Sequence, residues 1–97
     1  MANFVMLFRF TRQGLEKVKQ SPQRIDAFKK VFTSHGARIK EVYAMLGEYD
    51  TMFLVEAPDD ETAATLSLLI GRDGNVRAET HRAFTEEEFR RMVAQLP

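Results

Sequence analysis

Residues 38–57 read RIKEVYAMLGEYDTMFLVEA, two stretches rich in apolar side chains that are joined by the four residues GEYD. The stretches 38–46 and 51–57 carry the branched and aromatic residues that are typical of β-strands. Because the connection 47–50 is so short, the two strands are expected to pair side by side as an antiparallel hairpin. We place the other elements around this hairpin.

A strand and a helix flank the hairpin on each side. Alternating apolar residues predict a strand over 3–10, and a matching strand is expected over 76–84. Ser21 is expected to cap a helix that ends at the left-handed residue Gly36, and the acidic run 58–61 begins a second helix. The order βαββαβ predicts a ferredoxin-like α+β fold, an antiparallel four-stranded sheet with both helices on one face.

The end of the sequence carries its clearest local signature. Thr85 and Glu88 have the spacing of a capping box, in which each side chain accepts a backbone N–H of the other residue. After them, apolar residues recur at the spacing of one helix face: Phe89, Met92, Val93 and Leu96. We therefore predict a C-terminal helix and expect it to cover part of the helix-free face of the sheet.

The helix-free face needs cover because the strands 3–10 and 51–57 are apolar on both sides. In the first of them, Val5 and Leu7 point to the opposite side from Phe8. The C-terminal helix, about 16 Å long and 10 Å wide, shields less than half of a sheet of roughly 19 by 23 Å. Exposed apolar surface of the remaining extent normally signals association. We expect a homodimer that stacks sheet against sheet.

Composition and charge limit the function classes. The 97 residues suffice for one domain, 1–97, and the absence of cysteine excludes disulfides and thiolate catalysis and suits the cytoplasm. No apolar run approaches the ~20 residues that span a bilayer, and no leader opens the chain, so we expect no membrane contact. Basic residues predominate in the first half, but no aromatic side chains alternate with them, which argues against nucleic acid as a partner.

Short segments along nearly the whole chain resemble the GYD-domain family of small bacterial and archaeal proteins. The resemblance is carried by TRQGL (11–15), SPQR (21–24), GEYD (47–50), EAPD (56–59), GNVR (74–77) and RAFT (82–85). It implies an architecture similar to the dimeric α+β barrels, which include cofactor-free monooxygenases, small isomerases and ligand-sensing domains. Gly47, Tyr49 and Asp50 are signature positions that we expect to be structural, with Asp50 accepting amide hydrogens of the turn.

His81 is the strongest candidate for chemistry. On the predicted strand 76–84 it shares a face with Arg77 and Glu79, while the smaller residues of the other face suit packing under the helices. A histidine on the helix-free side can exchange a proton near neutral pH, with Glu79 orienting its ring. The alternative is a structural histidine that is hydrogen-bonded across a dimer or exposed at the sheet edge.

Tyr43, Arg9 and Phe8 complete the candidate ligand site. Tyr43 shares a strand face with Glu41 and is expected to line the same cavity as His81, where its hydroxyl can orient a ligand or take part in catalysis. Arg9 ends an apolar strand face and can hold a carboxylate through two hydrogen bonds. The alternatives are plain packing for Tyr43 and, for Arg9, an ion pair with an acidic residue of the second half.

No metal or cofactor is expected. The acidic run 59–61 could be mistaken for a metal site, but adjacent side chains at a helix start diverge, and helix capping explains them. The two histidines, His35 and His81, are far apart and have no cysteine companion. The sequence also contains no glycine-rich phosphate or dinucleotide loop.

Three functions are compatible with the sequence. The preferred hypothesis is a homodimer that binds a small aromatic or amphipathic molecule in an apolar pocket between sheet and helices or at the dimer interface, because the chain holds eight Phe and two Tyr beside a few polar groups. The second is a cofactor-independent oxygenase or isomerase that uses His81 with Glu79 or Tyr43 as its acid–base pair. The third is a structural or regulatory interaction module without a ligand.

Overall fold

The structure, a computed structural model, describes all residues 1–97 and has the predicted order of strands and main helices, with two short helical segments added after the first strand. The strands are β1 (Ala2–Phe10), β2 (Arg38–Ala44), β3 (Thr51–Ala57) and β4 (Val76–Ala83). The helices are α1 (Arg12–Glu16), α2 (Ser21–Ser34), α3 (Asp60–Arg72) and α4 (Glu86–Ala94), and a 3-10 turn, η1 (Val18–Gln20), joins α1 to α2. None of these helices combines the length and the apolar content that crossing a membrane requires.

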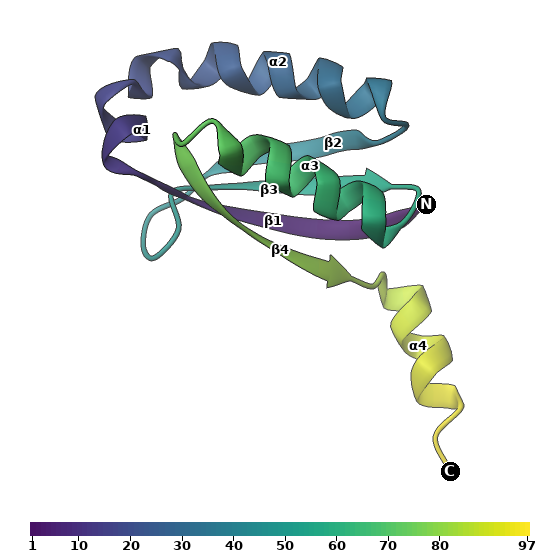
Figure 1. The fold of residues 1–97 in the computed structure, drawn as a ribbon. Coiled ribbons are helices and arrows are strands. Elements are labelled where there is room, and N and C mark those ends of the chain that lie inside the picture. The colour runs from purple at the N-terminus through teal and green to yellow at the C-terminus, as the bar shows by residue number, and fades with distance from the viewer.

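The strands form one antiparallel sheet in the order β2-β3-β1-β4, with α2 and α3 on one face of it (Figure 1). This arrangement confirms the predicted ferredoxin-like α+β fold. β1 and β3, which carry apolar side chains on both faces, are the two central strands. We call the face that α2 and α3 cover the covered face, and the other the open face.

The core lies between the covered face and the helices α2 and α3. Its buried side chains come from both layers: Phe4, Met6, Phe8, Phe32, Ala37, Phe53, Val55, Ala57, Ala63, Leu66 and Ile70. The rings of Phe8 and Phe53 meet edge to face with centroids 4.7 Å apart. Full burial of a large apolar side chain is worth about 1.5–3 kcal/mol, so this single layer supplies most of the stability of the domain.

Most helix ends follow the predicted capping residues. The Thr85 hydroxyl accepts the backbone N–H of Glu88, and the Glu88 carboxylate accepts that of Thr85, which confirms the capping box. Asp59 caps α3 by accepting an N–H of the first turn, and Gly36 follows α2 with the expected positive φ of 74°. Ser21 as an N-cap was wrong: α2 already includes it, because η1 leads directly into the helix.

Helix α4 forms as predicted but does not cover the sheet. It leaves the end of β4 and projects beyond the sheet, on the side opposite α2 and α3 (Figure 1), and the chain therefore measures 52 Å along its longest axis. Only two residues separate β4 from α4, and the helix continues away from the end of the strand (Figure 1). The open face thus lacks even the partial cover that the sequence suggested.

Candidate functional site

The open face has an apolar centre and a polar rim. Across the strands, Val5 pairs with Leu54 and Leu7 pairs with Met52, and these four side chains are all half-buried. The edge strands contribute polar side chains to the same face: Glu41 and Tyr43 from β2, and Arg77, Glu79 and His81 from β4. An apolar patch within a polar border is the usual composition of a protein interface.

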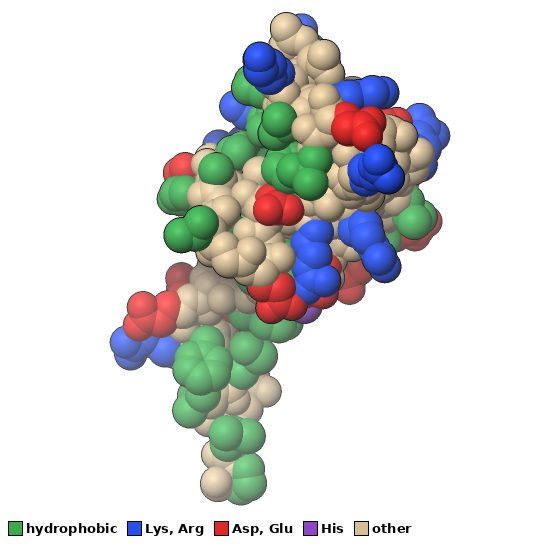
Figure 2. Space-filling view, turned by 90° about the vertical axis from the view of Figure 1, so that its left-hand side faces the viewer, with side chains coloured by type: hydrophobic (Ala, Val, Ile, Leu, Met, Phe, Trp, Pro, Cys, Tyr) green, Lys and Arg blue, Asp and Glu red, His purple; other side chains and the backbone are tan.

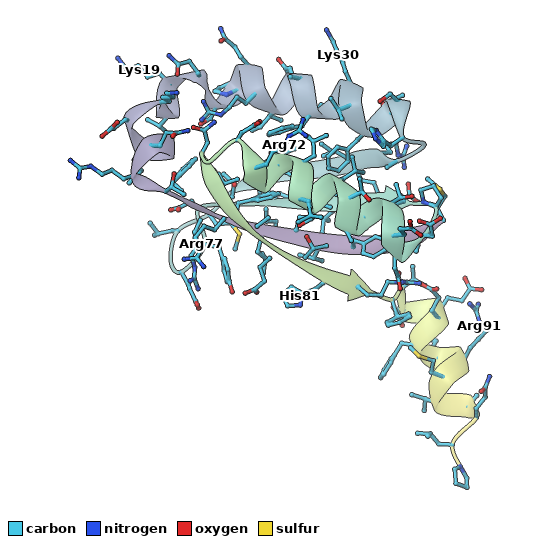
Figure 3. All side chains as sticks on the ribbon, in the orientation of Figure 1. Lys19, Lys30, Arg72, Arg77, His81 and Arg91 are labelled. Carbon is cyan, nitrogen blue, oxygen red and sulfur yellow. The ribbon has the colours of Figure 1, made fainter.

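The polar side chains of β4 lie where their alternation predicts. Arg77 and His81 point away from α2 and α3 (Figure 3). Glu79 lies between them on the same face, and its Oε2 is 2.7 Å from Nε2 of His81. The side chains of His81 and Glu79 are 55% and 50% exposed, so neither is enclosed in the single chain.

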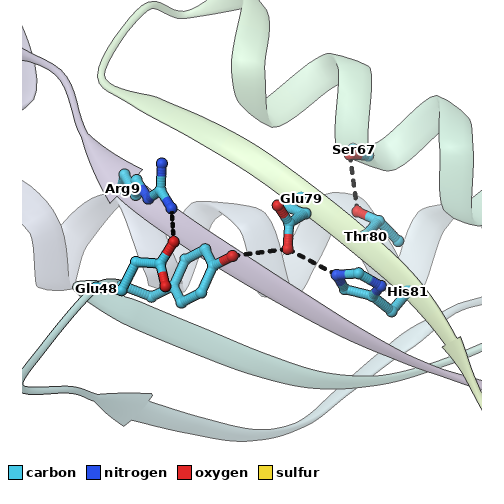
Figure 4. Close-up of polar contacts among 7 residues, drawn as sticks. Arg9, Glu48, Ser67, Glu79, Thr80 and His81 are labelled. Atoms are coloured by element: carbon cyan, nitrogen blue, oxygen red, sulfur yellow. Dashed lines mark hydrogen bonds and ion pairs between the residues drawn. The ribbon is translucent and has the colours of Figure 1, made fainter.

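The GEYD loop reaches over the open face to this pair (Figure 4). The Tyr49 hydroxyl donates a hydrogen bond of 2.8 Å to Oε2 of Glu79. Arg9 forms an ion pair with Glu48 and lies over the Tyr49 ring, 4.8 Å from its centroid. One connected group of side chains therefore runs from the loop, across β1, to His81 on β4.

Asp50 fixes this loop to the sheet. Its Oδ2 accepts the backbone N–H of Phe10 at 2.8 Å, and its own N–H donates to the carbonyl of Phe8 at 2.8 Å. We expected Asp50 to accept amide hydrogens of its own turn, whereas the carboxylate instead bonds to the end of β1. These two bonds hold the loop to β1, and the backbone of Gly47, with φ of 120°, gives the loop a conformation that side chains disfavour.

The hydrogen bonds of the cluster shift two of its pKa values. The hydrogen bond with His81, followed by that from Tyr49, lowers the pKa of Glu79 below its ordinary value. The hydrogen bond to Glu79 raises the pKa of Tyr49. Both shifts favour an ionised carboxylate beside a protonated phenol, so the cluster presents a carboxylate flanked by two groups that can exchange or donate a proton.

A hollow of about 200 Å³ opens beside this cluster. It is lined by Arg9, Tyr49, Arg77, Ala78 and Glu79. Arg9 and Arg77 are direct partners in the register of β1 and β4; Arg9 is paired with Glu48. Two guanidinium groups at one hollow suit a ligand that carries a carboxylate or another anionic group.

Tyr43 and His81 do not share a cavity within one chain. They occupy the same face but opposite edge strands, three strand spacings or about 14 Å apart. Neither lines any of the hollows of the single chain. A cavity that both residues line therefore requires a second molecule against the open face.

Phe8 lies on the other side of the sheet from the remaining candidates. Only 2% of its surface is exposed, and it lines a narrow apolar pocket of about 40 Å³ with Ile25 and Phe28 of α2. Such a space holds about one or two water molecules. Phe8 is thus a core residue on the covered face. Arg9, the next residue along β1, points to the open face because side chains alternate along a strand.

The acidic start of α3 serves the helix. Asp59 Oδ1 accepts the N–H of Thr62 at 2.8 Å, which lowers the pKa of Asp59, and Asp60 lies 3.9 Å from Arg82. No three His, Cys, Asp or Glu side chains gather closely enough to hold a metal ion. The structure thus gives each of these two aspartates a partner within the chain.

Glu48 is the member of the cluster that sequence reasoning missed. It lies in the signature loop, but its partner Arg9 is 39 positions away. The sequence offered one signal, because an ion pair with an acidic residue of the second half was the alternative role considered for Arg9, but Glu48 is the last residue of the first half, 1–48. Only the register of β1 against β3 and β4 shows which acidic residue lies within reach.

The sequence of the chain is similar to that of known proteins. The GYD domain profile matches residues 4–93. A relative from Thermus thermophilus, named glutamine synthetase and cystathionine beta-lyase binding protein, is 33% identical over 84 residues, which cover 86% of this chain and 88% of the relative.

Two solved structures share the fold. A crystal structure of FFRP-DM1 superposes with a TM-score of 0.59 at 16% identity and covers 87% of this chain and all of the other. The crystal structure of TTHA0845, also from Thermus thermophilus, superposes with a TM-score of 0.52 at 25% identity, over 88% of this chain and 95% of the other. Since the GYD profile spans nearly every residue, the chain belongs to the GYD domain family.

Proposed function

We propose that the protein is a homodimeric interaction module that binds other proteins, and that two copies join through their open faces. The observation that supports this most is the uncovered apolar centre of the sheet, formed by Val5, Leu7, Met52 and Leu54 inside a polar rim. A contiguous apolar patch bordered by polar residues often marks a site of association. A twofold axis lets the same patch cover itself.

The oligomeric state tests the first half of the proposal. Sedimentation velocity at micromolar concentration is expected to show a dimer. Leu54→Arg places a charge in the apolar centre and is expected to give a folded monomer, because burying an unpaired charge is costly. Leu68→Arg is the matched control, since Leu68 is exposed on α3, and this variant should stay dimeric. A wild-type monomer contradicts the proposal.

The second half concerns the partner proteins. The Thermus relative is named as a binding protein of two enzymes, and we propose that this chain binds the glutamine synthetase or the cystathionine beta-lyase of its own organism. Each purified enzyme can be immobilised on a biosensor and titrated with the chain. Saturable binding to at least one of them, and none to an unrelated enzyme of similar size, is the expected result. If the chain binds neither enzyme, the proposed partners are wrong.

The hollow at Arg9, Tyr49, Arg77 and Glu79 favours a second candidate function, the binding of a small molecule. Its volume of about 200 Å³ is less than the ~300 Å³ and more of typical small-molecule pockets, so a small acid fits the single chain best. Native mass spectrometry of the purified protein, followed by Arg77→Ala, tests this. A bound small acid that is lost in the variant supports it, and an empty wild-type protein contradicts it.

Catalysis stays a prediction. The His81–Glu79 pair is the acid–base group that a cofactor-independent oxygenase or isomerase would use. In one chain both groups are exposed to solvent, and a dimer through the open face would shield them. His81→Ala should abolish turnover of any substrate that the protein is found to convert, and unchanged turnover would remove the enzymatic alternative.

A further inference from the structure

We propose that α4 is a clasp between subunits, whose apolar stripe packs on the hairpin loop of a second copy. The α4 stripe consists of Phe89, Met92 and Val93 of the helix together with Leu96, two residues beyond its end, and the hairpin loop is the segment 45–50 between β2 and β3. This inference rests on the homodimer proposed above and adds the arrangement of the two copies and the role of α4.

The α4 stripe faces the space that a second copy would occupy. All four of its side chains are exposed, and in Figure 2 the hydrophobic atoms of α4 gather on the side turned toward the viewer, which is the left-hand side of Figure 1. This side borders the region beneath the open face. Arg91 points the other way, toward the outside of the molecule (Figure 3), and pairs with Glu87 along the helix.

Helix α4 also needs a surface to pack on. It has nine residues, and isolated helices shorter than about 12 residues are only marginally stable in water. The capping box adds about 0.5–2 kcal/mol, and the two i,i+4 ion pairs, Glu86–Arg90 and Glu87–Arg91, add only about 0.2–0.5 kcal/mol each. Burial of the apolar stripe is the larger contribution that a partner can supply.

The hairpin loop offers a matching apolar surface at the other end of the sheet. Leu46 is fully exposed at the loop, and Met45 and Tyr43 beside it are also exposed. The bond from Tyr49 to Glu79 holds the loop over the open face, near β4. Both α4 and the loop therefore project on the open side, α4 from one end of the strands and the loop from the other (Figure 1).

A twofold axis that runs across the strands brings these two features together. It places a second copy against the open face with its ends reversed, so that each loop lies at the partner's α4. The contact then occurs twice, with the same residues on each side, as an isologous interface requires. An axis along the strands would not bring α4 to the loop.

The area that the two copies can bury favours such a clasp. Two stacked sheets of this size bury roughly 870 Å² in total, which is less than the ~1,200 Å² of a typical stable interface. Two α4 contacts, each the footprint of a helix about 13.5 Å long and 10 Å wide, add roughly 500 Å². With α4 the total reaches about 1,400 Å² and enters the range of stable complexes.

Disulfide trapping tests the arrangement directly, because the chain contains no cysteine. The full-length double variant Leu46→Cys/Val93→Cys should form a covalent dimer under mild oxidation. The two positions cannot join within one chain, since β4 with its eight residues separates the ends by about 26 Å and a disulfide needs Cα atoms within about 7 Å. Leu68→Cys/Val93→Cys, with the exposed Leu68 on the helix side, is the matched control and should stay uncrosslinked.

Each other outcome contradicts the clasp. A covalent dimer of Val93→Cys alone shows that α4 packs on α4, and a dimer in sedimentation without any trapped product shows that α4 packs elsewhere. In both cases the homodimer itself stands, whereas a wild-type monomer removes the homodimer and the clasp together. As a second measurement, Phe89→Ser should weaken dimerisation at least tenfold, while Arg91→Ala on the outer side changes it less than twofold.

Discussion

The two faces of the sheet carry similar apolar side chains in very different surroundings. In β3, Phe53 and Val55 are almost fully buried under α2 and α3, whereas Met52 and Leu54 remain half-exposed on the open face. The same alternation holds in β1, where Met6 is fully buried. Neighbouring residues of one strand therefore belong to two layers, only one of which is completed within the chain.

This difference separates stability from interaction. The covered face has the helices, the edge-to-face aromatic contacts and the tightly packed core. The open face has the signature loop, the polar cluster and the hollow. Substitutions on the covered face should thus act on the folding of each chain, and those on the open face should act through a second molecule.

The sharpest test of this difference uses two neighbours in β3. Phe53→Ala should lower the free energy of unfolding by about 3–5 kcal/mol, because it leaves a cavity against Phe8 and Phe32. Leu54→Ala should lower the free energy of unfolding much less in dilute protein. Its effect should grow with protein concentration, because a larger fraction of the wild-type protein is then dimeric. Urea denaturation at two protein concentrations measures both. Equal losses that do not depend on concentration would contradict the division between the faces.

Alanine substitutions at two glycines, Gly14 and Gly71, test the packing of the covered side. A Cβ at Gly14 would lie 1.8 Å from the carbonyl oxygen of Asn75, whereas a Cβ at Gly71 in α3 would meet open space. Gly14→Ala should therefore destabilise the fold by about 2–3 kcal/mol, and Gly71→Ala should stabilise it by about 0.5–1 kcal/mol. Thermal unfolding of the two variants distinguishes them, and a harmless Gly14→Ala would mean that α1 does not pack tightly on residues 73–75.

The sequence predicted the covered face better than the open one for a physical reason. Helix periodicity, the capping box at Thr85 and the alternation in β1 are local signals, and each reports on residues within a few positions of itself. The order of the elements then leaves few topologies that keep the crossovers right-handed. The fold, the two central strands and the open-face position of His81 all follow from these signals.

The contacts of the signature loop could not be predicted in this way. Arg9–Glu48 and Tyr49–Glu79 join residues 39 and 30 positions apart, and they depend on how far one loop bends over the sheet. The position of α4 is a similar case, because its stripe has no counterpart within the chain that could fix its direction. Both features involve the open face, whose surroundings a single sequence does not contain.

Asp50 joins the hairpin loop to the end of β1, and its replacement should have a smaller effect on stability. Asp50→Ala leaves the Phe10 N–H without its acceptor and should cost about 1–2 kcal/mol, the usual penalty for a partly buried unpaired amide. Hydrogen exchange of the Phe10 amide should become faster, while Asp73→Ala at the exposed end of α3 should change stability by less than about 0.5 kcal/mol. Unchanged exchange at Phe10 would show that this carboxylate does not anchor the loop.

The smallest effect concerns the pKa of Glu79. Because its pKa is lowered in the folded chain, its contribution to stability is present above the ordinary glutamate pKa and is lost as the pH falls through the lowered value. His81→Ala removes the larger cause and Tyr49→Phe the smaller one, so both variants should raise the Glu79 midpoint, His81→Ala by more. Carbon NMR of the side-chain carboxyls measures this, with Glu88, whose pKa is lowered by the N–H of Thr85, as internal control. A Glu79 midpoint that neither variant moves would mean that the hydrogen bonds from His81 and Tyr49 do not lower the pKa of Glu79 in solution. A shift of Glu79 alone, with Glu88 unchanged, would show that Glu79, His81 and Tyr49 are electrostatically coupled on the open face.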